Sequence, residues 1–275
     1  MTTTRRATAP AAGVLRIIPT EWFDIRRPQR LVERSLMVYR HTWLIIVSGI
    51  FEPLFYLLSI RVGLSELVGD VEVGGRLVPY DEFVAPGLLA AAAMNGAIFD
   101  STMNIFHKWK AARLYDAVLS TPLSAADVAL GEISFAVLRG MFYATAFLAT
   151  MGVLGMTQSW WVLMAVPIAG LIGYAFAALG MAATTYMRGW ADFEYVPAAT
   201  LPLFLFSATF YPVSAYGDFG WVVQLSPLYH GVELVRSANL GDWSLADLAH
   251  AGVLITLAAI GTTIAARRLG RLLLA

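Results

Sequence analysis

The amino-acid sequence predicts an all-α membrane protein with six transmembrane helices, and three observations lead to that fold class. Hydrophobic residues make up 58% of the 275 positions and charged residues 14%, whereas a soluble domain has about 45–50% apolar and about 25% charged residues. The mean hydropathy is +0.66. Six apolar stretches reach or approach the roughly 20 residues that a helix needs to cross a bilayer. Lipid must therefore be the solvent for much of the chain.

The six apolar stretches are interpreted as helices because their hydrophobic residues are continuous and do not alternate. Backbone groups in lipid must be satisfied within the protein, which only helices and closed barrels achieve. The fifth stretch is short and contains Pro197 and Pro202, so its limits are the least defined. The expected spans are Trp43–Ile60, Phe83–Phe106, Ile133–Leu154, Trp160–Thr185, Tyr195–Tyr211 and Leu245–Ala266.

The chain is expected to divide into residues 1–41, a cytoplasmic tail with an amphipathic interfacial helix, and residues 42–275, the six-span transmembrane domain. The helix can begin at Pro28, since proline suits a first helical position. An apolar stripe at helical spacing follows, opposite charged residues, which is typical of a helix lying on a membrane surface. Alternatively, the segment extends the first span into the cytoplasm. The stripe consists of Val32, Leu36, Tyr39 and Trp43.

Basic residues are unevenly distributed over the loops, although the net charge of the chain is zero. If the N-terminus is cytoplasmic, 15 of the 19 Lys and Arg residues fall in cytoplasmic segments. The outer segments then hold only Arg61, Arg76 and Arg236, and Arg139 lies within a span. Cytoplasmic loops of membrane proteins carry an excess of Lys and Arg. Both termini are therefore expected in the cytoplasm.

The loops between the spans also contain predicted structure. In the cytoplasmic loop 107–130, Ala111–Ser120 is expected to form a short helix that ends at Thr121-Pro122. Ser124 and Asp127 have the spacing of a capping box that opens the third span. Residues 212–240 are too polar to cross the membrane and too apolar for an ordinary loop. They are expected to form an outer re-entrant pair of short helices, broken at Ser226-Pro227.

The residues that most enzymes need are missing from the sequence. There is no cysteine, and hence no disulfide and no thiolate site. The two lysines follow His107 and Trp109, so neither belongs to a nucleotide-binding P-loop, which requires Gly before Lys. We also find no HExxH zinc motif and no GxSxG nucleophile elbow. The sequence therefore predicts no catalytic, metal-binding or cofactor-binding residue in this chain.

Polar residues inside the spans are functional candidates, because such groups are expensive to place in lipid. Glu52 lies about 14 Å from the inner end of its span, at a rise of about 1.5 Å per residue. Asp100 and Arg139 lie at similar depths and could form a packing salt bridge, or Arg139 could instead reach the headgroups. Glu52 either serves the transport pathway or is a neutral group beside the Pro53 kink. The candidates are Glu52, Asn95, Asp100, Asn104 and Arg139.

Several segments of the chain resemble the ABC exporter permeases of the type 2 class, in particular the nodulation-factor and daunorubicin-type drug exporter permeases. The match runs in order over about residues 40–270, with one departure at Ala208, where glycine is expected. The segments that carry it are residues 51–58 (FEPLFYLL), 83–89 (FVAPGLL), 119–124 (LSTPLS), 138–140 (LRG), 201–207 (LPLFLFS) and 226–230 (SPLYH).

The resemblance implies a dimer of permeases with two separate ABC ATPase subunits on the cytoplasmic face of a bacterial plasma membrane. ATP and Mg would bind only to the ATPase subunits. The pathway would lie between the permeases, lined largely by spans one, two and five. A coupling helix between spans two and three would contact the ATPase, unless that helix lies passively on the membrane. It would contain Arg113, Leu114, Tyr115, Asp116, Leu119 and Pro122.

The expected function is therefore export of an amphiphilic substrate such as a drug, a glycolipid or a polysaccharide-like molecule. An ion-coupled secondary transporter or channel is the alternative, with Glu52 and Asp100 as a proton or cation site. Such transporters commonly contain an internal repeat, and we see none in this sequence. An intramembrane enzyme would need a nucleophile or a metal cluster, which the sequence does not offer.

Overall fold

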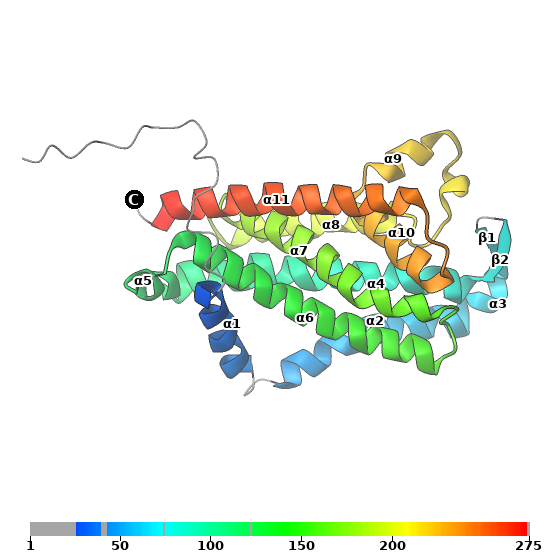
Figure 1. Ribbon diagram of the computed structural model, residues 1–275, viewed down its shortest axis with the longest axis horizontal. Helices are drawn as coiled ribbons and strands as arrows, with labels where there is room; N and C mark the ends of the chain where they lie inside the picture. The colour runs from blue at the N-terminus through cyan, green and yellow to red at the C-terminus, as the bar shows by residue number, and fades with distance from the viewer. Residues whose placement is uncertain (1–25, 40–42, 74, 122, 274–275) are drawn as a thin grey trace, which may run out of the picture.

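The computed structural model describes residues 26–39, 43–73, 75–121 and 123–273, and within them the chain is almost entirely helical. Its long helices run side by side along one direction (Figure 1). The principal helices are α1 (Arg26–Tyr39), α2 (Trp43–Gly63), α4 (Tyr80–Phe99), α6 (Ala125–Val153), α7 (Ala165–Thr184), α8 (Tyr195–Leu205), α10 (Pro227–Leu240) and α11 (Leu245–Leu273).

Shorter elements connect these helices. The π-helical segments η2 (Asp100–Asn104) and η3 (His107–Ala111) continue α4, and the 3-10 segments η4 (Trp160–Met164) and η5 (Trp190–Glu194) precede α7 and α8. The remaining elements are α3 (Ser65–Val68), β1 (Asp70–Val73), β2 (Arg76–Pro79), α5 (Leu114–Leu119), η6 (Val213–Phe219) and α9 (Gly220–Gln224).

Four helical stretches among the described residues are long and apolar enough to cross a membrane. They coincide with the second, third, fourth and sixth predicted spans. The predicted first span corresponds to α2, a helix of 21 residues. The total of six spans stays a prediction. The four stretches are Tyr80–Ala111, Ala125–Val153, Trp160–Thr184 and Leu245–Leu272.

The fifth predicted span forms a shorter helix than the sequence indicated. Helix α8 has 11 residues, about 16 Å at the rise of an α-helix, and it ends at Leu205 in place of Tyr211. The helix contains Pro202, and the chain then turns through Ala208, whose φ is +57°. Few residues other than glycine adopt this left-handed conformation readily. That geometry explains why glycine is expected at position 208.

Helix α7 lies at the centre of the bundle and packs against α4, α6, α10 and α11. Its small residues Ala169, Gly173 and Ala177, spaced four apart along one face, are buried. Helix α11 approaches α7 so closely that a Cβ at Gly261 would lie 2.7 Å from the carbonyl carbon of Ala178. Small side chains let helix backbones meet in this way in membrane proteins.

Helix α1 crosses α6 near the N-terminal end of α6, and the two helices meet there in a similarly close contact. Leu31 is 3% exposed, and a Cβ at Gly131 of α6 would lie 2.8 Å from its Cβ. The side of α1 that carries Leu36 and Met37 is instead exposed, by 53% and 64%. These contacts place α1 against α6, whereas its position at a membrane surface stays a prediction.

The two ends of the bundle differ in character (Figure 1). Helix α5, the first turns of α1 and the C-terminal end of α11 gather at one end, which we call the α5 end. The hairpin of β1 and β2 lies with α3 and α9 at the other, the hairpin end. At the hairpin end, α9 and α10 are separated at Ser226-Pro227, as predicted, while their re-entry into a membrane stays a prediction.

Candidate functional site

The candidate coupling helix α5 is a six-residue helix at the α5 end of the bundle. It begins after Arg113, which is exposed and has a φ of +46°. Leu114 packs against the hydrophobic core, and Tyr115 is completely buried. Helix α5 is therefore held by its inner face, while Arg113, which directly precedes it, is exposed. Asp116 and Leu119 belong to this helix but their side chains lie outside the described part of the chain, as does Pro122.

The turn after α5 leads directly into α6 through the predicted capping box, which is confirmed. The backbone N–H of Asp127 donates to Ser124 Oγ at 3.2 Å, and the N–H of Ser124 donates to Asp127 Oδ2 at 2.9 Å. Such reciprocal bonds satisfy two of the free N–H groups at a helix start. The start of α6 is consequently fixed by its own cap, at Ser124.

Tyr115 also faces a buried ion pair that links two spans. Lys108 Nζ lies 2.6 Å from Glu132 Oε2, and the two side chains are 13% and 3% exposed. Burial raises the pKa of Tyr115 well above its usual range, and the neighbouring Glu132 carboxylate raises it further. Tyr115 therefore remains a neutral phenol at physiological pH, and its hydroxyl faces the carboxylate.

The predicted pairing of Asp100 with Arg139 is confirmed by the structure. Arg139 Nε lies 2.8 Å from Asp100 Oδ2, with the side chains 10% and 4% exposed. Asn104 contacts the same carboxylate, so it shares a face with Asp100 as expected. Asp100 and Asn104 are the first and last residues of the π-helical segment η2. Single π turns in helices are frequent at functional sites.

The two ion pairs form a ladder between α6 and the extended α4. One rung joins Asp100 to Arg139 and the next joins Lys108 to Glu132. Because the two helices are antiparallel, the later residue on the extended α4, Lys108, pairs with the earlier residue on α6, Glu132. The sign of the charge also alternates between the rungs on each helix. We call these four residues the polar ladder.

Sequence reasoning missed the second rung of the ladder. Glu132 directly precedes the predicted start of the third span at Ile133, so it was not among the polar residues considered inside the spans, although α6 begins at Ala125. Lys108 was assigned to the loop beyond the second span. The signal that could have identified the rung is the spacing: Lys108 follows Asp100 by eight residues and Glu132 precedes Arg139 by seven, about two helical turns in each case.

Asn95 lies apart from the polar ladder. It is exposed and lines a groove of about 240 Å³ between α4 and α8, together with Thr102 and Thr200. Glu52 lies within α2, but its side chain is outside the described part of the chain. The structure thus brings Asp100, Asn104 and Arg139 together, and places Asn95 on a different surface.

The charged side chains of this region are joined in two buried ion pairs between the extended α4 and α6. Among the described residues, no group of three or more His, Asp or Glu side chains gathers to hold a metal ion. Breaking a buried ion pair is strongly destabilising, so paired groups on two helices tend to move together. The arrangement therefore connects the buried face of α5, through Tyr115 and Glu132, to the two spans that carry the ladder.

Comparisons with known proteins identify the family. Residues 29–240 match the model of the ABC-2 type transporter membrane family. The chain is 31% identical to nodulation protein J of Sinorhizobium fredii over 232 residues, 83% of this chain and 85% of that protein. It is 28% identical to nodulation protein J of Rhizobium leguminosarum bv. viciae over 251 residues, 90% and 91% of the two chains. The chain is therefore a multi-pass membrane protein that belongs to the ABC-2 type transporter family.

Proposed function

We propose that this ABC transporter membrane subunit exports an amphiphilic substrate, with ATP hydrolysed by separate subunits that dock on α5. The observation that carries the proposal is the setting of α5: one face is fixed in the core by Tyr115, and Arg113 at its start is exposed. A passive surface helix has no need of a fully buried tyrosine against a buried ion pair. Family membership also favours this function over an ion-coupled transporter.

The proposed pathway lies between two copies of this chain or between this chain and a homologous permease. Its walls would be α2, α4 and α8. Helix α8 has no buried residue among those described, and α2 exposes Phe51, Phe55 and Tyr56 by 48%, 62% and 50%. These helices are incompletely covered, which supports a role for their free faces in dimer contact and substrate passage. Asn95 would then face the pathway from α4.

The orientation in the membrane can be tested with single cysteines, since the chain has none of its own. The proposal places the α5 end in the cytoplasm of a bacterial cell and the hairpin end outside. Ser120 is exposed at the α5 end, and Leu67 is 82% exposed in α3 at the hairpin end. In intact cells, an impermeant maleimide should label Leu67→Cys and leave Ser120→Cys unmodified. Labelling of Ser120→Cys alone would reverse the orientation.

Docking on α5 predicts a specific effect of reversing one exposed charge. Arg113→Glu is expected to reduce co-purification of the ATPase subunit by about tenfold, the loss that corresponds to about 1.4 kcal/mol of binding free energy. The reason is that α5 would present a carboxylate where the partner meets a guanidinium. The measurement is the molar ratio of ATPase to permease after affinity purification, together with ATP hydrolysis by the complex.

The matched control for this variant is Arg76→Glu. Arg76 is also exposed but lies on β2 at the hairpin end, so its reversal should leave the complex intact. Both variants should insert and fold, because neither side chain is buried. Equal co-purification of the ATPase with the two variants would contradict docking on α5.

A further inference from the structure

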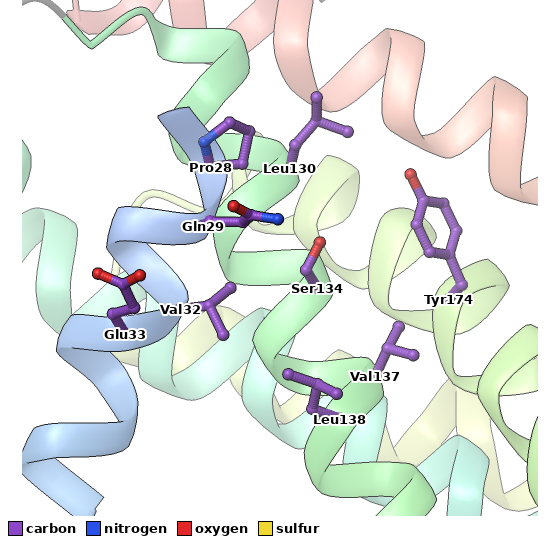
Figure 2. A pocket seen from close by; sticks show the side chains of 9 residues that line it. All are labelled: Pro28, Gln29, Val32, Glu33, Leu130, Ser134, Val137, Leu138 and Tyr174. Atoms are coloured by element: carbon purple, nitrogen blue, oxygen red, sulfur yellow. The ribbon is translucent and has the colours of Figure 1, made fainter. Parts of the chain in front are cut away.

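A groove of about 620 Å³ runs over α6 at the α5 end of the bundle. Helix α1 forms one side of it and Tyr174 of α7 the other (Figure 2). Val32 points from α1 towards α6, whereas the carboxylate of Glu33 points away from the groove. The floor is formed by residues of α6, chiefly Leu130, Ser134 and Val137. The surface of the groove is therefore apolar, apart from hydroxyl groups and the Gln29 amide.

The groove continues into a surface that faces the bilayer. Its far end is formed by Leu138, which is 47% exposed, and Phe142 one turn further along α6 is 52% exposed. Helices α6 and α7 both belong to stretches able to cross a membrane. Large exposed apolar side chains on such helices are expected to contact lipid tails. The groove also lies on α1, α6 and α7, and not on the α2 and α8 faces proposed for contact between permeases.

The length of the groove suits part of an acyl chain. From Leu130 to Leu138 it follows α6 for eight residues, about 12 Å at the rise of an α-helix. It starts near the beginning of α6 and reaches towards the middle of the span. A lipid tail that enters from the α5 end would therefore lie parallel to α6, with its headgroup near the start of α1.

The sequence is basic at the headgroup end of the groove. Helix α1 opens with Arg26-Arg27, just before Pro28 and Gln29 at the edge of the groove. The end of α11, with the exposed Arg267 and Arg271, packs beside the start of α6, where Gly270 lies near Ala125. Basic clusters beside membrane helices attract anionic lipid headgroups, and the start of a helix also favours anions.

We propose that this groove binds an anionic phospholipid from the leaflet at the α5 end, with one acyl chain between α1 and α6 and its phosphate at the start of α1. The lipid fills the space that the Leu31–Gly131 contact leaves between the two helices. It thereby fixes α1 to the bundle. The proposal concerns a bound lipid and does not depend on the direction of transport or on its substrate.

Photo-crosslinking in nanodiscs tests the groove directly. The full chain is placed in mixed phosphatidylglycerol and phosphatidylcholine nanodiscs that contain a trace of either lipid with a photoactivatable acyl chain. The phosphatidylglycerol probe should label the α1 and α6 peptides around residues 28–33 and 130–138. Labelling should exceed that by the phosphatidylcholine probe by at least about fivefold, the preference that one basic side chain provides near an anionic surface.

Two tryptophan variants provide the matched comparison. Ser134→Trp fills the groove and should remove the labelling of these peptides. Thr145→Trp adds the same side chain about three turns further along the same face of α6, at an exposed site outside the groove, and should leave the labelling unchanged. Arg26→Ala combined with Arg27→Ala should abolish the preference for phosphatidylglycerol while the tail labelling persists. Monodisperse elution of each variant confirms folding.

Three results would overturn the proposal. Full labelling of Ser134→Trp would show that the tail lies elsewhere, and equal labelling by the two probes in the native chain would exclude headgroup selection. If Ser134→Trp instead separated a dimer of this chain, the groove would be a contact between copies.

Discussion

Replacing Asp100 by alanine is expected to reduce the free energy of unfolding by about 3–5 kcal/mol, because it leaves the buried Arg139 without its carboxylate partner. The double variant Asp100→Leu with Arg139→Met removes both charges and should recover most of that loss, since apolar residues of similar volume often replace a buried pair without penalty. Thermal unfolding of the purified chain in mild detergent at neutral pH measures both effects.

The control for Asp100 is another acidic residue that the structure leaves exposed. Glu72 lies in β1 at the hairpin end, and Glu72→Ala should change stability by less than about 0.5 kcal/mol, as is usual for surface substitutions. If Asp100→Ala unfolds like the native chain, the ion pair contributes nothing and Arg139 reaches the headgroups instead. That outcome would favour the alternative that the sequence left open.

Replacing Glu132 by alanine is expected to combine a similar loss of stability with a loss of coupling to ATP hydrolysis. The variant leaves the buried Lys108 unpaired, which should lower the free energy of unfolding by about 3–5 kcal/mol. It also removes the carboxylate that faces Tyr115. The double variant Lys108→Met with Glu132→Leu should restore stability but not coupling, because no polar contact then connects Tyr115 to α6. Hydrolysis by the assembled complex, compared with that of the ATPase subunit alone, reports the coupling.

An exposed ion pair provides the comparison for Glu132. Arg30 and Glu33 form a pair at 3.0 Å with side chains 76% and 54% exposed, and exposed pairs contribute only about 0–1 kcal/mol. Glu33→Ala should therefore affect neither stability nor hydrolysis strongly. If the double variant at Lys108 and Glu132 regained full coupling as well as stability, the ladder would serve packing alone.

Local signals in the sequence predicted much of the fold. The capping box at Ser124 was predictable because it depends on two residues three apart, and the break at Ser226-Pro227 because proline cannot continue a helix. The apolar stretches of the sequence predicted the four helical stretches that are long enough to cross a membrane. The apolar span was assigned only from Ile133, although the capping box marks the helix start at Ser124, because Ala125 to Glu132 include charged and small residues that an apolar window excludes.

Features that depend on long-range contacts could not be predicted in the same way. The end of α8 at Leu205 depends on a turn at Ala208, whose carbonyl accepts a hydrogen bond from Arg236 at 2.7 Å. The β-hairpin was missed although Gly74-Gly75 stands between two short alternating segments, a recognised turn signal. The role of Glu52 stays a prediction, because the structure places this residue in α2 but does not describe its side chain.

The π-helical segment between Asp100 and Asn104 links a change in local helix geometry to a rotation of the residues that follow it, towards the α5 end. A π turn holds about one residue more than an α turn. Rewinding it to α geometry would rotate everything beyond it by about 100°. Lys108 would then swing away from Glu132, while Asp100 at the start of the segment would stay against Arg139. The Lys108–Glu132 pair would therefore separate, while the Asp100–Arg139 pair would stay in place.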